Sequence, residues 1–164
     1  MTTTTTTEYV TIDGLKLSVK IAGTGRPFLF LHGLCGDALQ PLELFPDDAG
    51  WQCHALESRG HGGSDIGDMK ELSIRRLTED ATAYLESLDC GPAVIGGVSM
   101  GAAIALRLTA DRPELAAGLV LGRPAWSINR HRQISSHTGG SHAISANMAP
   151  GRHAGCSRNP PWRR

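Results

Sequence analysis

The sequence Gly97-Val98-Ser99-Met100-Gly101 stands between an apolar run, Ala93-Val94-Ile95, and a run of small and apolar residues that begins at Ala102. A strand, a Gly-x-Ser-x-Gly turn and a helix in this order are typical of a bend that presents a serine hydroxyl as a nucleophile. Because Gly97 and Gly101 carry no Cβ, the chain can turn sharply here without a side-chain clash. We therefore predict that Ser99 lies at the tip of a tight turn and that its hydroxyl faces a reaction site.

The residues around this turn alternate between predicted strands and helices. Asp13-Gly14 is a strong hairpin signal between strands at 8–12 and 15–21, and in the second strand Lys16, Ser18 and Lys20 form the polar face. The other predicted elements are strands at 28–31, 51–56 and 115–121, a short helix within 34–46, and helices at 73–89 and from Ala102 to Arg112. This order predicts an α/β fold with a mostly parallel sheet that begins with an antiparallel hairpin.

Length and composition predict a single-domain protein without a membrane-spanning segment. Its 164 residues fit a single domain, with a folded core predicted over 8–124, a disordered threonine-rich leader over 1–7, and a disordered or aberrant tail over 125–164. The chain begins without a signal peptide, has no apolar run long enough to span a membrane, and has four cysteines without metal spacing. We expect a cytoplasmic protein with reduced thiols and no membrane association.

Charge divides the chain into two unlike parts. Residues 1–114 hold all sixteen acids against nine Lys and Arg, which gives 9 − 16 = −7, whereas residues 115–164 hold seven Arg and no acid, which gives +7. The basic tail contains four histidines but neither a compact set of metal ligands nor interleaved aromatic residues, so we predict no metal site and no nucleic-acid partner. Nucleotide binding is also excluded, because Val98 occupies the place of the second dinucleotide glycine and no Gly-Lys-Ser/Thr is present.

Three segments are predicted to meet at the carboxyl ends of neighbouring parallel strands, where open α/β sheets form their sites. These segments are Leu31–Gly36 with its His-Gly turn, Glu57–Ser64 with the sequence Glu-Ser-Arg-Gly-His-Gly-Gly-Ser, and the Ser99 turn. In this order and at these spacings they resemble the α/β-hydrolase family over about residues 8–122. The family more often has Asp where this chain has Glu57.

The resemblance implies a role for each of these segments. Ser99 is the expected nucleophile, and the backbone N–H groups of Met100 and Leu34 are the expected oxyanion hole. The expected substrates are small esters, lactones or other acyl compounds, and no cofactor is implied. Gly33, Gly97 and Gly101 support the turns. We interpret His32 as a turn residue bonded to backbone, and Arg59 and His61 as residues that tie their loop to the sheet edge.

The rest of a catalytic triad is not evident after Ser99. The only later acids are Asp111 and Glu114, and Asp111 is expected about 18 Å further along the helix. The four later histidines follow no recognisable strand. We therefore hypothesise that the gene is truncated or frame-shifted near residue 123. The alternative function is then a catalytically inactive remnant that binds at most a ligand or partner, and its strand at 115–121 is an exposed sheet edge prone to self-association.

Overall fold

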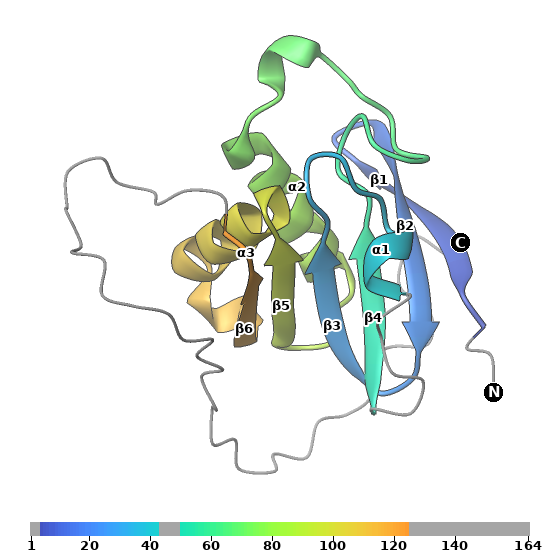
Figure 1. The fold of residues 1–164 in the computed structure, drawn as a ribbon, viewed down its shortest axis with the longest axis vertical. Coiled ribbons are helices and arrows are strands. Elements are labelled where there is room, and N and C mark those ends of the chain that lie inside the picture. Colours follow the sequence, from blue (N-terminus) through green and yellow to red (C-terminus); the bar gives the residue numbers. More distant parts are fainter. Residues whose placement is uncertain (1–3, 43–49, 125–164) are drawn as a thin grey trace.

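A computed structural model describes residues 4–42 and 50–124, and within these ranges the chain forms a six-stranded sheet in the order β1-β2-β4-β3-β5-β6 (Figure 1). The strands are β1 (Thr6–Ile12), β2 (Leu15–Gly23), β3 (Arg26–Leu31), β4 (Trp51–Leu56), β5 (Ala93–Val98) and β6 (Ala116–Gly122). β2 pairs antiparallel with β1 and β4, whereas β3, β4, β5 and β6 run parallel. The predicted mostly parallel sheet with an N-terminal hairpin is confirmed.

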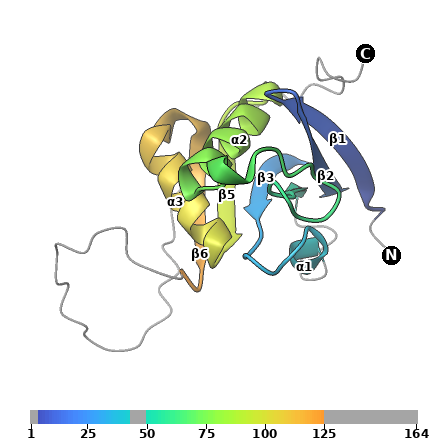
Figure 2. The same ribbon diagram turned by 90° about the horizontal axis from the view of Figure 1, so that it is seen from above.

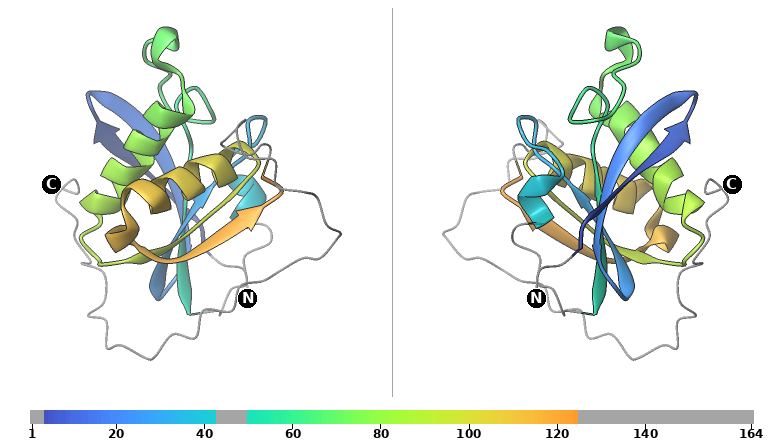
Figure 3. Two further views of the ribbon diagram at one scale, coloured as in Figure 1. Left: turned by 90° about the vertical axis from the view of Figure 1, so that its left-hand side faces the viewer. Right: turned by 90° about the vertical axis from the view of Figure 1, so that its right-hand side faces the viewer.

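Helices lie on both faces of this sheet. The two long helices, α2 (Ile74–Ser87) and α3 (Met100–Asp111), lie side by side on one face, and the short α1 (Leu39–Leu42) lies on the other (Figures 2 and 3). Two 3-10 turns, η1 (Met69–Glu71) and η2 (Pro113–Leu115), precede α2 and β6. Within the described ranges, no helix has the length and apolar character needed to cross a membrane.

Two sequence-based assignments differ from the structure: the start of the first strand and the exposure of Ser18. β1 begins at Thr6 because Thr6 and Thr7, which we assigned to the leader, pair with Ile21 and Lys20. Ser18, which we placed on a polar face, is 1% exposed. It is buried because the loop after β4 folds over it: the Ser18 N–H donates to Ser64 Oγ at 2.8 Å, and the Glu57 N–H donates to the Ser18 carbonyl at 2.9 Å. The predicted tail at 125–164 lies outside the described residues.

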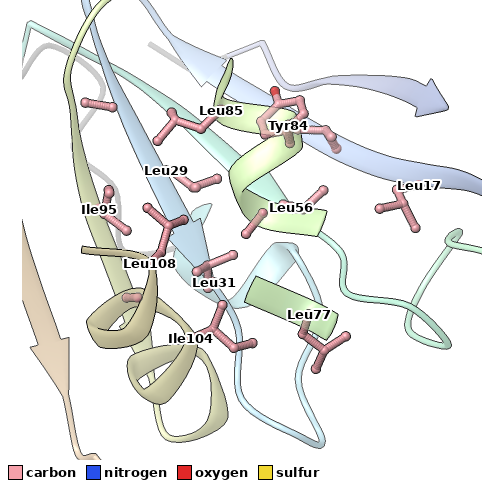
Figure 4. Packing of buried hydrophobic residues seen from close by; sticks show 14 of the residues in the cluster. Leu17, Leu29, Leu31, Leu56, Leu77, Tyr84, Leu85, Ile95, Ile104 and Leu108 are labelled. Carbon is pink, nitrogen blue, oxygen red and sulfur yellow. The ribbon is translucent and has the colours of Figure 1, made fainter. Parts of the chain in front are cut away.

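The hydrophobic core lies between the sheet and the α2–α3 layer (Figure 4). Apolar residues of α2 at steps of three and four point into it, as the sequence predicts. The largest contributors from the sheet and the helices are Leu17, Leu29, Leu31, Ile95, Tyr84, Ile104 and Leu108. Burial of such side chains stabilises the fold by about 1.5–3 kcal/mol each, which fixes the positions of the strand ends.

Two polar pairs are also buried beside α2. His54 on β4 lies 2.7 Å from the Tyr84 hydroxyl through Nδ1 and 3.1 Å from Gln52 Oε1 through Nε2. These contacts fit a neutral ring in which Nε2–H donates and Nδ1 accepts. Arg59 forms two hydrogen bonds with Asp80, at 2.5 and 2.8 Å, and this pair joins the loop after β4 to α2.

We predict that the buried His54 makes stability depend on pH. Burial lowers the pKa of His54 to about 4, from an ordinary value of 6.5. The unfolded chain therefore takes up this proton first as the pH falls, so the free energy of unfolding is highest above about pH 6.5 and decreases toward pH 4, by up to about 3 kcal/mol. Urea unfolding between pH 4 and 7 measures this slope. His54→Gln should flatten it, and an unchanged slope in that variant would contradict the prediction.

Candidate active site

The Ser99 turn has a backbone conformation that is rare outside glycine. Ser99 has φ 53° and ψ −111° and stands between the last residue of β5 and the first residue of α3. Such a conformation costs of order 1–3 kcal/mol and persists only where the surroundings enforce it. Here the Ser99 N–H donates to the Gly122 carbonyl at 3.0 Å, and the Ser99 carbonyl accepts from the Ala103 N–H at 3.2 Å. The strained residue is therefore held from both β6 and α3.

The two glycines of the turn allow backbones to touch. A Cβ at Gly101 would overlap the carbonyl of Leu31, and a Cβ at Gly97 would overlap the carbonyl of Gly101. Neither glycine has a positive φ, so the requirement is for space rather than for a left-handed conformation. The first turn of α3 packs directly on the end of β3 as a result, which brings Ser99 to the loop that follows β3.

The loop after β3 brings the backbone amide of Leu34 close to Ser99, in addition to the amide of Met100. The Gly36 N–H donates to the Gly33 carbonyl at 2.9 Å and closes a tight turn, and a Cβ built at Gly33 would lie 3.6 Å from Ser99 Cβ. In residues 4–42 and 50–124, neither the Leu34 N–H nor the Met100 N–H donates a hydrogen bond to a described acceptor. Met100 is the first residue of α3, where an amide has no partner within the helix.

His32 is committed to the backbone around it. Its Nδ1 lies 2.7 Å from the Gly33 carbonyl, and its Nε2 accepts the Ser58 N–H at 3.0 Å. Because Nε2 accepts, the proton of the neutral ring is on Nδ1. Burial is the main cause that lowers the pKa of His32, and nearby His61 adds to it. His32 therefore holds the turn in a neutral form and has no nitrogen left for Ser99.

His61 contacts the loop that follows β3 rather than the sheet edge to which we had assigned it. Its Nε2 lies 2.7 Å from the Leu34 carbonyl, and its Nδ1 lies 2.9 Å from the Arg59 carbonyl. The His61 ring also lies 4.8 Å from the His32 ring. The loop after β4 is thus joined directly to Leu34, which lines the same two cavities as Ser99.

Glu57 fixes the base of the same loop. Its carboxylate accepts the Gly63 N–H at 2.7 Å and lies 3.6 Å from Lys20 Nζ. Burial alone would raise the pKa of Glu57, but the Gly63 amide, neighbouring hydrogen bonds and the Lys20 ammonium outweigh it and leave this pKa below its ordinary value. An ionised, buried carboxylate here is a structural anchor, so Glu in place of the family's usual Asp still closes the loop.

Among the described residues, no acid and histidine complete a triad with Ser99. Asp111 pairs with Arg107 at 3.2 Å and Glu114 with Arg112 at 2.5 Å. All three described histidines, His32, His54 and His61, have both ring nitrogens in hydrogen bonds to other groups. The four histidines of the tail lie outside the described ranges.

Ser99 borders two cavities with different linings. One, of about 640 Å³, is lined by Gln40 and Arg123 together with less polar residues such as Leu34, Val98 and Pro124. The other, of about 370 Å³, is lined mainly by apolar side chains from α2 and from Leu34 and Met100. In the part of the chain that the structure describes, no three His, Cys, Asp or Glu residues gather to hold a metal ion.

Comparisons with known proteins identify the family of this chain. Residues 26–139 match the family described as "alpha/beta hydrolase fold". "Putative non-heme bromoperoxidase BpoC" of Mycobacterium tuberculosis is 33% identical over 123 residues, which cover 73% of this chain and 46% of BpoC. The chain thus spans about half the length of this curated relative.

Solved structures show the same fold. Epoxide hydrolase VrEH1 from Vigna radiata has a TM-score of 0.65 and 27% identity, over 71% of this chain and 39% of that one. The thioesterase domain from the curacin biosynthetic pathway has a TM-score of 0.68 over 72% of this chain and 46% of that one. With 22% identity, this second likeness concerns the fold alone.

We predict that the packing of α3 on β3 does not tolerate a methyl group at Gly101. Gly101→Ala places a Cβ against the Leu31 carbonyl, and overpacking of this kind should lower the free energy of unfolding by at least about 2 kcal/mol. Gly118→Ala is the matched control, because a Cβ there would meet only Val94 Cγ2, at an ordinary 3.5 Å. Equal urea midpoints for the two variants would contradict this account of the turn.

Proposed function

The chain belongs to the α/β-hydrolase family, and from this premise we propose that it is a serine hydrolase of small ester, lactone or other acyl substrates. The observation that carries the proposal is the strained Ser99 residue, at φ 53°, between two amides that have no described acceptor. Backbone strain of this kind is retained where a function depends on it. The names of the relatives describe several reactions, so the substrate class is taken from the site.

The proposed chemistry follows from the placement of these groups. Ser99 Oγ attacks the carbonyl carbon of the substrate, and the electron pair of the C=O bond moves to the oxygen. The N–H groups of Met100 and Leu34 donate hydrogen bonds to this oxyanion, and the N-terminus of α3 adds the positive end of its dipole. In other enzymes, loss of one such donor lowers the rate by ~10²–10³.

The proton of Ser99 needs an acceptor, and the described residues supply none. A serine hydroxyl is a weak nucleophile until a base removes its proton. Turnover therefore depends on a base from outside 4–42 and 50–124. The second candidate function is a binding module without turnover, and the observation that favours it is the engagement of His32, His54 and His61 elsewhere.

The cysteines bear on where the protein works. Cys35 and Cys53 are free thiols, and burial raises the pKa of Cys53 to about 12, which keeps this thiol protonated and inert. Free thiols are usual in reducing compartments. We propose the cytoplasm on this ground.

A serine-directed fluorophosphonate distinguishes the two candidate functions. If Ser99 is an activated nucleophile, its Oγ bonds to phosphorus, fluoride leaves and the proton passes to the base, so the protein gains a stable label detectable by mass spectrometry. We predict that labelling is lost in Ser99→Ala and retained in Ser87→Ala, whose hydroxyl donates to the Tyr84 carbonyl at 2.6 Å. Equal labelling of Ser99→Ala and wild type would refute the assignment, and an unlabelled wild-type protein would favour the binding module.

We also propose self-association through β6. This strand lies at the edge of the described sheet, and Val120 and Leu121 on it are 51% and 38% exposed. An edge strand with exposed apolar side chains is a template for pairing with another chain, and a charge on it disfavours such pairing.

Val120→Lys is therefore predicted to shift the protein toward the monomer in sedimentation velocity. Thr11→Lys, on the exposed edge strand β1 at the other side of the sheet, is the control and should leave the distribution unchanged. A monomeric wild type, or the same response to both variants, would end this proposal.

A further inference from the structure

Arg123 stands beside the nucleophile because of how β6 is bonded. The carbonyl of Gly122, the last residue of β6, accepts the Ser99 N–H at 3.0 Å, so the next residue emerges at the serine turn. Arg123 has φ 44°, a left-handed conformation that turns the chain away from the strand direction. Arg123 then lines the 640 Å³ cavity together with Ser99 and Gln40.

The charge of Arg123 has no counterpart in the described structure. Every other arginine of residues 4–42 and 50–124 has a partner in the structure. One lies over the Trp51 ring, and the others form ion pairs with acids. These arginines are Arg26, Arg59, Arg75, Arg76, Arg107 and Arg112. Arg123 has no such ion pair or ring contact with a described residue, and residues 125–164 contain no Asp or Glu at all.

Among the described residues, the acids closest in sequence to the cavity lining do not neutralise the charge of Arg123. Asp37 does not line the cavity, and its Oδ1 accepts the Leu39 N–H at 2.8 Å. Glu43, Asp47 and Asp48 lie outside the described ranges. Since an arginine guanidinium is always protonated in proteins, the cavity carries one fixed positive charge with no described anion to neutralise it.

The second cavity at Ser99 is more apolar and has no unpaired cation among the described residues of its wall. Leu72, Ile74 and Leu77 line it together with Met100, and the arginine on its wall, Arg59, is neutralised by Asp80. Ser99 and Leu34 border both cavities. A carbonyl held at Ser99 therefore has a cationic compartment on one side and an apolar compartment on the other.

We infer that the substrate is an ester or related acyl compound that carries a carboxylate on one side of the scissile carbonyl and an apolar group on the other, with Arg123 as the carboxylate-binding residue. This inference rests on the proposed function for the identity of the reacting group. A guanidinium binds a carboxylate through paired N–H donors. One cation balances the single charge of a carboxylate, whereas a phosphate monoester carries nearly two charges at neutral pH.

The experiment compares monobenzyl succinate with its neutral counterpart, methyl benzyl succinate, by isothermal titration calorimetry. Ser99→Ala is used as the host protein so that neither ester can be hydrolysed during the titration. Because Arg123 is exposed to solvent, the anionic ester should bind about three to five times more tightly than the neutral ester. This ratio should fall to about one in Ser99→Ala/Arg123→Gln, and Arg123→Lys should retain most of it because the charge remains.

Two further variants of the same host separate the compartments. Arg26→Gln removes an arginine at the opposite end of β3, where it lies over Trp51, and should leave the ratio unchanged. Ile74→Ala should weaken both benzyl esters and also keep the ratio. Equal binding of the two esters to the host, or a preference that survives Arg123→Gln, would overturn the role of Arg123. A wild-type protein that the fluorophosphonate does not label would overturn only the nucleophilic role of Ser99.

Discussion

The close contact between α3 and the end of β3 is the constraint on which the site depends. Because Gly101 has no Cβ, the first turn of the helix rests on the carbonyls of Leu31 and His32. This contact sets the distance between the serine turn and the loop that carries Leu34. A single methyl group in that contact would separate the Met100 and Leu34 amides, which are the two donors of the proposed oxyanion hole.

The loop after β4 supports this arrangement from the side. Glu57 fixes its base through Gly63 and Lys20, Arg59 ties it to Asp80 on α2, and His61 reaches the Leu34 carbonyl. Each link is a charged or polar group, and its partner is distant in sequence in every case except Gly63. Such networks are costly when partly broken and rigid when complete, so the loop fixes the orientation of the Leu34 peptide without touching the reacting atoms.

The sequence predicts the elements well and their side-chain partners poorly. Strand alternation and the helical spacing of Leu77, Ala81 and Tyr84 are local patterns, and the ordered motifs identified the family. Asp80 was missed although its place on the apolar face of α2 was a signal, because an acid there needs a buried cation. Arg123 and the His61–Leu34 contact had no local signal at all. Both arise where loops from distant parts of the sequence meet at one end of the sheet.

The groups around Ser99 divide into those that act on binding and those that act on reaction. A carboxylate bound by Arg123 keeps its full charge from the free substrate to the transition state, so this contact stabilises both and lowers the substrate concentration needed for half-maximal rate. In the proposed reaction, the Met100 and Leu34 amides donate to an oxygen whose negative charge develops only during attack, so their contribution is expected in the rate of the bound complex. The two proposals therefore place recognition on the β6 side of the serine and catalysis at the junction of β3 and α3.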